Sequence, residues 1–254
     1  METLFLIIAF VFGTVMGSFY HVVATRLSND ESIIAPGSHC PKCNHFLKWY
    51  ENIPIISYII QKGKCRNCNS KIPISYLVVE IITGLLFMAC YHAFGLSVKL
   101  IISLIFTSSL IIVIVSDIEY MIILDEVLMT ATVLILLTYL IFEGIYVTCF
   151  YFLSGVGAFV AMYGIKLIGD KAFNKESLGG GDIKLMFLFG LVIGFPMAIC
   201  SIFIATFIAF PISLIILFSD KENIIPFGPF LSIAAVLVLV TKLDLTIVLD
   251  FIMK

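Results

Sequence analysis

The chain has 254 residues, of which 61% are hydrophobic and 13% are charged, and its formal net charge is −2 at pH 7. Its mean hydropathy is +1.14. Soluble domains are about 45–50% apolar, so this composition excludes a soluble globular protein. It predicts an all-α polytopic membrane protein. The small net charge gives no sign of a nucleic-acid partner, and we expect none.

Apolar runs of about 20 residues can cross the hydrocarbon core of a bilayer, and the chain contains eight candidates. We place them near residues 4–25, 74–94, 98–117, 126–143, 147–168, 183–195, 197–218 and 227–250. The sixth run is short, and Gly194-Phe195-Pro196 leaves open whether 183–218 is two spans or one kinked helix. The sequence therefore predicts eight transmembrane helices, with seven as the alternative.

Basic residues are distributed unevenly between the two sides of the predicted membrane. If the N-terminus faces outward, all but three of the 15 Lys and Arg residues lie inside, Lys221 among them. Cytoplasmic loops carry an excess of Lys and Arg, so this orientation is favoured. It places Asp117, at the end of the third span, and Asp182, at the start of the sixth, at the cytoplasmic face.

Two C-x2-C motifs lie in the one extramembrane segment that is large enough to be a module. They are Cys40 with Cys43 and Cys65 with Cys68, and 21 residues separate the two pairs. Paired motifs of this kind are typical of structural Zn²⁺ sites, which give a fixed fold to a short loop with little core. Disulfides or redox dithiols are the alternatives, and the predicted cytoplasmic location disfavours disulfides.

Asp182 follows three glycines, Gly179, Gly180 and Gly181, at the entrance to an apolar segment. Ionisable residues at membrane depth are costly and usually functional, and Asp182 and Asp117 could share one proton, as hydrolysis of a peptide bond requires. Glycines permit unusual backbone angles and close approach by an extended substrate. The structural alternatives are a helix-end residue for Asp117 and a first-turn acid for Asp182.

Two further ionisable residues lie near these motifs. Glu80 is about two turns inside the second span, so it faces a bundle interior or a cavity. A substrate-binding role and a structural hydrogen bond are equally open for it. Lys184 is two residues beyond Asp182 and therefore points away from it on a helix.

Several motifs occur in one order along nearly the whole chain. They are Gly17 to Tyr20 with Arg26-Leu27, the cysteine pairs flanking Lys48 to Pro54, Glu80, Asp117 to Glu119 with Asp125, Gly179 to Leu185, and Pro226 to Phe230. In this order they resemble the type IV prepilin peptidases, a family of GxGD-type membrane aspartyl proteases. The sequence departs from the family pattern at His21 (usually Asn), Ser75 (Arg), Leu77 (Pro) and Leu124 (Pro).

The resemblance implies a leader peptidase in the bacterial cytoplasmic membrane that acts at the cytoplasmic face. Asp117 and Asp182 would be its catalytic pair. Its substrate would be a type IV prepilin or pseudopilin with a basic leader and a hydrophobic helix, and membrane lipid would surround it. Bifunctional members also methylate the new N-terminus with S-adenosylmethionine. A peptidase without methyltransferase activity is the nearest alternative.

Two other classes of function remain open on the sequence alone. A proton-coupled transporter could use Asp117, Asp182 and Glu80 as a relay, and a membrane scaffold could use the zinc loop to recruit partners. The scaffold would tolerate Asn at both aspartates, whereas the protease would not. For the peptidase we predict three regions, which are a first transmembrane helix (1–27), a zinc-binding cytoplasmic loop (28–73) and a helical protease core (74–254).

Overall fold

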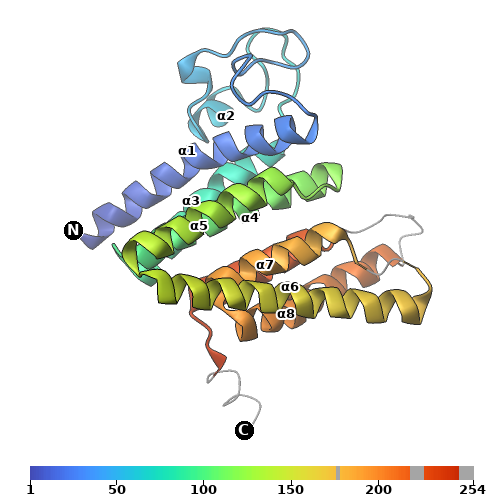
Figure 1. Cartoon of the computed structure of the whole chain (residues 1–254). Coiled ribbons are helices and arrows are strands. Elements are labelled where there is room, and N and C mark those ends of the chain that lie inside the picture. The colour runs from blue at the N-terminus through green and yellow to red at the C-terminus, as the bar shows by residue number, and fades with distance from the viewer. Residues whose placement is uncertain (176–177, 218–225, 246–254) are drawn as a thin grey trace. The chain divides into compact units, whose positions relative to one another are not determined.

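The computed structural model of the chain describes residues 1–175, 178–217 and 226–245. Each of the eight predicted spans corresponds to one helix (Figure 1). Their bounds are α1 (Glu2–Ser28), α3 (Ile74–Phe94), α4 (Val98–Tyr120), α5 (Asp125–Phe142), α6 (Ile145–Phe173), α7 (Gly180–Ile193), α8 (Phe195–Leu217) and α9 (Gly228–Thr241). The predicted all-α fold is confirmed. Residues 246–250 of the predicted last span, and Lys221, lie outside the described residues.

Six of these helices are long and apolar enough to cross a membrane, so the chain is a multi-pass membrane protein. They are α1, α3, α4, α5, α6 and α8. The other two, α7 and α9, have 14 residues each. At 1.5 Å per residue such a helix is about 21 Å long, less than the roughly 30 Å of a hydrocarbon core. Full crossing by α7 and α9 stays a prediction.

The chain forms two compact units, Met1–Gly95 and Leu96–Lys254. In the first, α1 packs along α3. Glycine allows this approach, because a Cβ on Gly13 would lie 2.8 Å from the Cα of Gly84, and one on Gly17 would lie 2.7 Å from the hydroxyl oxygen of Thr83. Small residues bring membrane helices together in this way.

The segment between α1 and α3 is a small module of loops with a 3₁₀-helix, η1 (Trp49–Glu51), and a short helix, α2 (Ile56–Ile60). The two cysteine pairs in it form matching turns. In each, the first cysteine accepts a backbone hydrogen bond from an asparagine four residues later, Asn44 or Asn69, and both asparagines have left-handed backbone angles. Asparagine tolerates that conformation, so the Cys-Asn step explains why the two turns share one shape.

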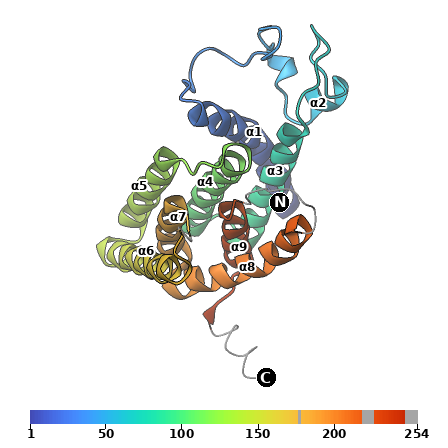
Figure 2. The same cartoon turned by 90° about the vertical axis from the view of Figure 1, so that its right-hand side faces the viewer.

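In the second unit, α7 is the central helix and contacts α4, α5, α6, α8 and α9 (Figure 2). It lies close to α6 because a Cβ on Gly190 would meet the backbone oxygen of Ser154, and one on Gly155 would lie 2.9 Å from the backbone oxygen of Phe187. Gly194, with φ of 79°, separates α7 from α8. The 183–218 segment is therefore two helices, as predicted. The central position of α7 is what holds its first turn inside the unit.

Candidate functional site

Asp117 lies in the last turn of α4, and its side chain is buried although it is close to a helix end. The residue is 6% exposed, and its carboxylate accepts the backbone N–H of Gly228, the first residue of α9. Gly228 is required at this point, because a Cβ there would collide with the carboxylate oxygen Oδ2 of Asp117. The sequence motif around Pro226 to Phe230 thus has a physical role that sequence reasoning did not assign.

Asp182 is the third residue of α7, which makes it a first-turn acid, and it is 7% exposed. Its carboxylate accepts the backbone N–H of Gly179, the N-cap residue of the helix. The carboxylate oxygen Oδ1 of Asp182 is also buried, but it has no hydrogen-bond partner among the described residues. Buried polar atoms are nearly always paired, so an unpaired carboxylate oxygen is expected at a site that binds a water or a substrate.

The two aspartates are close enough for the charge of Asp117 to act on Asp182 within the second unit. Ile123, in the loop between α4 and α5, lies beside them. Its side chain is 2.8 Å from the position of a Cβ on Gly181 and 3.2 Å from that of one on Gly228. Ile123 therefore packs against the start of α7, which carries Asp182, and against the start of α9, which contacts Asp117. Sequence reasoning missed it, because an isoleucine in an apolar chain gives no signal.

The three glycines before Asp182 do not have the unusual backbone angles that we expected from them. Gly179 has an ordinary extended conformation, and the next two residues begin α7. Their value is space instead. A Cβ on Gly181 would strike Ile123, whereas Gly180 has nothing within 4 Å of such a Cβ. Gly180 therefore has open space beside it, and the close approach of a substrate backbone there stays a prediction.

Lys184 pairs with Asp125, in another helix. Its Nζ lies 2.6 Å from the Oδ2 atom of Asp125, the first residue of α5, and both side chains are half exposed. This ion pair links the start of α5 to the first turns of α7. Together with the α4–α5 loop, it connects α4, α5 and the first turns of α7.

Glu80 lies in the first unit and is bound to the module that precedes α3. Its Oε2 atom accepts the backbone N–H of Ile55 at 2.7 Å, and its carboxylate also interacts with the Ser18 hydroxyl. Ile55 has φ of 61°, an uncommon backbone for a β-branched residue. The geometry favours the structural alternative for Glu80, which fixes Ile55 and the start of α2. Its substrate-binding role stays a prediction.

The four cysteine sulfurs of the module are close enough to share one metal ion, since all lie within 4.8 Å of one another. The Cys40–Cys68 and Cys43–Cys65 sulfur distances are 3.8 and 3.9 Å. In a tetrahedral site with Zn–S bonds of about 2.3 Å the sulfurs are about 3.8 Å apart. The geometry therefore fits Zn²⁺.

Hydrogen bonds at Cys40 and Cys68 favour the thiolate form, which is the form that binds zinc, whereas burial and the neighbouring thiols of Cys40 and Cys68 raise the pKa of Cys65. The Ser70 hydroxyl, followed by the backbone N–H groups of Cys43 and Lys42, lowers the pKa of Cys40 to about 6. Ser70 also lowers the pKa of Cys68. Sequence reasoning did not identify Ser70, whose position two residues after the last cysteine is its only signal.

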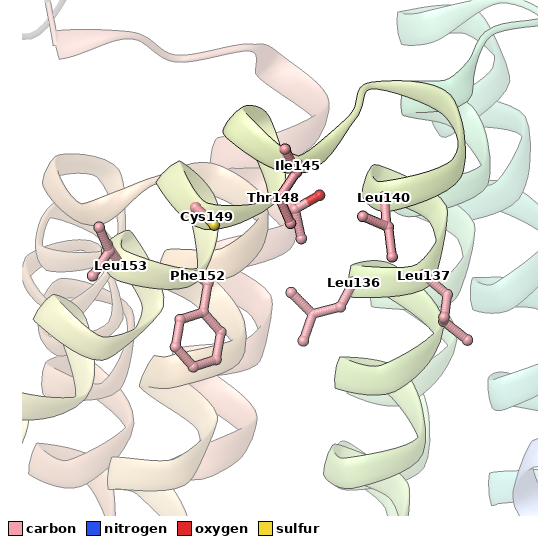
Figure 3. A pocket seen from close by; sticks show the side chains of 8 residues that line it. All are labelled: Leu136, Leu137, Leu140, Ile145, Thr148, Cys149, Phe152 and Leu153. Atoms are coloured by element: carbon pink, nitrogen blue, oxygen red, sulfur yellow. The ribbon is translucent and has the colours of Figure 1, made fainter.

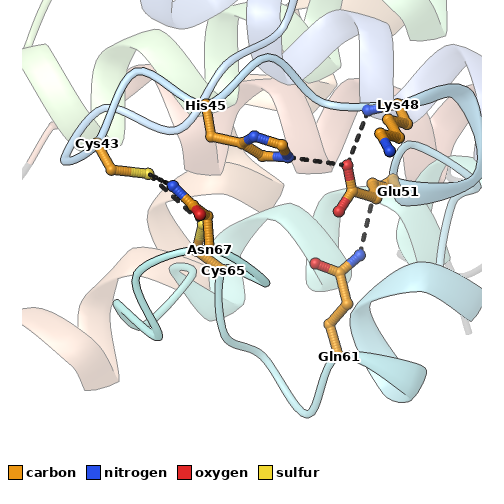
Figure 4. Close-up of polar contacts among 7 residues, drawn as sticks. All are labelled: Cys43, His45, Lys48, Glu51, Gln61, Cys65 and Asn67. Carbon is orange, nitrogen blue, oxygen red and sulfur yellow. Dashed lines mark hydrogen bonds and ion pairs between the residues drawn. The ribbon is translucent and has the colours of Figure 1, made fainter.

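A second set of contacts joins the first cysteine turn to η1 (Figure 4). Glu51 is buried, and its Oε2 atom accepts the backbone N–H of Lys48 at 2.8 Å and lies 3.3 Å from Nε2 of His45. The Lys48 N–H, and then His45, lower the pKa of Glu51. Nearby, Asn67 donates to the sulfur of Cys43 at 3.6 Å. These contacts hold the metal site and the Lys48 to Pro54 motif together.

A groove of about 370 Å³ lies between α5 and α6, away from the aspartates (Figure 3). Its lining is almost entirely apolar, with Leu136, Leu140 and Phe152 among the side chains. Thr148 and Cys149 are the only lining residues with a hydroxyl or a thiol, and no carboxylate, imidazole or amine lines the groove.

The fold and the site define a multi-pass membrane protein with a pair of buried carboxylates and a separate four-cysteine module. Comparison with known proteins gives the family. Residues 11–94 match the Bacterial Peptidase A24 N-terminal domain, and residues 104–240 match the Type IV leader peptidase family. This chain belongs to the Type IV leader peptidase family. No solved structure matches it.

Three curated relatives with the name Prepilin leader peptidase/N-methyltransferase are similar to this chain. The protein from Bacillus subtilis (strain 168) is 34% identical over 234 residues, which cover 91% of this chain and 92% of the relative. The one from Myxococcus xanthus (strain DK1622) is 35% identical over 188 residues, covering 74% of this chain and 56% of the relative. The one from Vibrio cholerae is 29% identical over 251 residues, covering 94% and 97%.

Proposed function

We propose that this chain removes the leader peptides of type IV prepilins or pseudopilins, with Asp117 and Asp182 as the catalytic pair. The observation that carries the proposal is the buried Oδ1 atom of Asp182, which has no partner among the described residues and lies within the electrostatic reach of Asp117. Family membership and the names of the relatives supply the reaction class and the substrate.

The chemistry requires that the pair holds one proton between its two carboxylates. Two acids at short range cannot both ionise cheaply, so the pair titrates as a unit. The ionised carboxylate takes a proton from water as the water oxygen attacks the scissile carbonyl carbon, and the protonated one donates to the carbonyl oxygen. Proton transfer to the leaving nitrogen then breaks the C–N bond. Either aspartate can take either role.

The location of the reaction follows from the predicted orientation of the chain. The uneven distribution of bases supports an orientation in which both aspartates lie at the cytoplasmic face of the bacterial cytoplasmic membrane. A prepilin hydrophobic helix in the same membrane would present its basic leader there. The open side of Gly180, two residues before Asp182, gives an extended substrate room to approach the pair.

Methylation of the new N-terminus with S-adenosylmethionine rests on the names of the relatives. The described residues contain no strand–helix–strand unit with a glycine-rich loop, the common site for such a nucleotide. We therefore assign no residue and no step of methyl transfer. The four cysteines would bind a structural Zn²⁺, which would fix the fold of the module and take no part in peptide hydrolysis.

The proposal is tested by co-expressing the chain with a type IV prepilin and measuring the intact mass of the product. We expect loss of the leader with the wild-type chain, and no loss with Asp117→Asn or Asp182→Asn. An additional methyl group on the product would establish the second activity. Cleavage by either variant would refute the catalytic pair, and an uncut prepilin beside a folded wild-type protein would favour a transporter or a scaffold.

A further inference from the structure

The short helix α2 presents an apolar face to its surroundings. Ile56, Ile59 and Ile60 lie at positions i, i+3 and i+4 on one face, and they are 54%, 63% and 68% exposed. Tyr58 lies on the other face, where its hydroxyl donates to the backbone oxygen of Ile72 at 3.4 Å. Exposed apolar patches of this kind mark interaction sites, so the face needs an occupant.

The depth of α2 relative to α3 indicates what that occupant is. The 21 residues of α3 make it about 31 Å long, which equals the thickness of a hydrocarbon core, so Ile74 lies near the core boundary. Glu80 is six residues further on, about 9 Å along the helix. Because Ile55 donates to the Glu80 carboxylate, the start of α2 lies within one side-chain length of the second turn of α3. Interfacial helices bury their apolar face to about 5–10 Å.

Charge on the same segment matches a membrane surface. Residues 52–79 contain the bases Lys62, Lys64, Arg66 and Lys71 and no acid. Lys64 and Lys71 oppose each other in an antiparallel bridge, and both are exposed. Like charges directly opposite one another are destabilising, and an anion between them would remove that cost. Anionic headgroups attract clusters of bases close to the membrane.

We propose that α2 is an interfacial anchor that inserts Ile56, Ile59 and Ile60 into the cytoplasmic leaflet while Lys62, Lys64 and Lys71 bind anionic phospholipid headgroups. The anchor holds the four-cysteine module on the membrane surface. The same bases would repel the basic leader of a prepilin, so a lipid fits this surface better than the substrate does. The inference does not depend on the peptidase activity.

The single tryptophan of the chain makes a direct test possible. In the variant Trp49→Phe/Ile59→Trp the only indole lies on α2. The full-length protein is placed in nanodiscs of phosphatidylcholine with or without phosphatidylglycerol, and its fluorescence is quenched either by lipids brominated on the acyl chains or by aqueous acrylamide. We expect strong quenching by bromolipid, weak quenching by acrylamide, and a blue-shifted emission when phosphatidylglycerol is present.

Two further variants separate the apolar and the charged contributions. Ile56→Ser/Ile60→Ser in the same background should lower bromolipid quenching by roughly half, and Lys62→Gln/Lys64→Gln/Lys71→Gln should remove the phosphatidylglycerol dependence. The matched controls are Ile34→Ser and Lys42→Gln. Ile34 is an exposed isoleucine before the first cysteine turn, and Lys42 is an exposed base within that turn. Neither substitution should change the quenching or its dependence on phosphatidylglycerol. An indole at position 59 that is open to acrylamide and insensitive to bromolipid would overturn the proposal. Quenching relieved by an added prepilin would assign the face to the substrate instead.

Discussion

The buried acids of the first unit differ from Asp182 in the second unit in the hydrogen bonds that their carboxylates accept. Glu51 and Glu80 each accept a backbone N–H, at 2.8 and 2.7 Å, and each ties a loop to its neighbour. Asp182 is buried as deeply, yet one of its oxygens has no partner among the described residues. The hydrogen bonds of Glu51 and Glu80 hold their loops in place, whereas the unpaired oxygen of Asp182 is available to bind a water or a substrate.

Zinc removal gives the largest expected effect and tests the structural side of this comparison. Zinc binding contributes about 10–16 kcal/mol to the folding of small zinc modules, so Cys40→Ser should release the metal and unfold residues 28–73. Metal analysis of the purified protein should show about one zinc per wild-type chain and almost none in the variant. Cys149→Ser, an exposed cysteine on α6, should leave the metal content unchanged. Equal zinc contents in the two variants would contradict the site.

The acids themselves give the second largest effect. Asp182→Asn should lower the rate of leader cleavage by about 10²–10⁴-fold, the range for loss of acid–base catalysis. Glu80→Gln keeps an oxygen that can accept the Ile55 N–H, so its cleavage rate should remain close to that of the wild type. Rates are measured with detergent-solubilised enzyme and a synthetic prepilin. If Glu80→Gln lost as much activity as Asp182→Asn, the distinction between structural and chemical acids would not hold.

The neighbouring glycines sharpen the comparison within the site. Gly181→Ala places a methyl group 2.8 Å from Ile123, and overpacking of this kind costs about 1–3 kcal/mol. Its melting temperature and cleavage rate should both fall, and Ile123→Ala in the same chain should restore them. Gly180→Ala has open space and should fold normally. A raised KM in Gly180→Ala would place the substrate there, and an unchanged KM would exclude it.

Breaking the Lys184–Asp125 ion pair should have the smallest effect. Half-exposed pairs contribute about 0–1 kcal/mol, so Lys184→Met should hardly change the melting temperature. Because the pair joins α5 to the turn after Asp182, we expect a modest fall in kcat with an unchanged KM. The exchanged variant Lys184→Asp/Asp125→Lys should recover kcat, and failure to recover would mean that the pair does not position the site.

Much of the fold could be predicted from the sequence, because the signals are local. Hydropathy located eight helices, and the glycine at 194 separated α7 from α8. The spacing of the cysteines predicted a metal site that the sulfur distances fit. Catalytic roles for Asp117 and Asp182 stay predictions, although the structure brings both into one unit.

Contacts between distant segments could not be predicted, because they depend on packing. Nothing local links Ile123 to Gly228, or Ile55 to Glu80. Two departures from the family pattern illustrate this, since His21 and Ser75 lie 3.1 Å apart at Nε2 and Oγ. The two departures are therefore in direct contact. Leu124 has φ of −75°, within the range that the usual proline would fix, so the backbone at this position would accept a proline.

The pH dependence of leader cleavage tests the shared proton of Asp117 and Asp182 most directly. It is measured as kcat/KM for the purified protein in nanodiscs with a synthetic prepilin. A pair that needs one ionised and one protonated carboxylate predicts a bell-shaped profile, because activity is lost when both are protonated and when both are ionised. A rate that keeps rising through alkaline pH would show that another group activates the water, and would contradict the account.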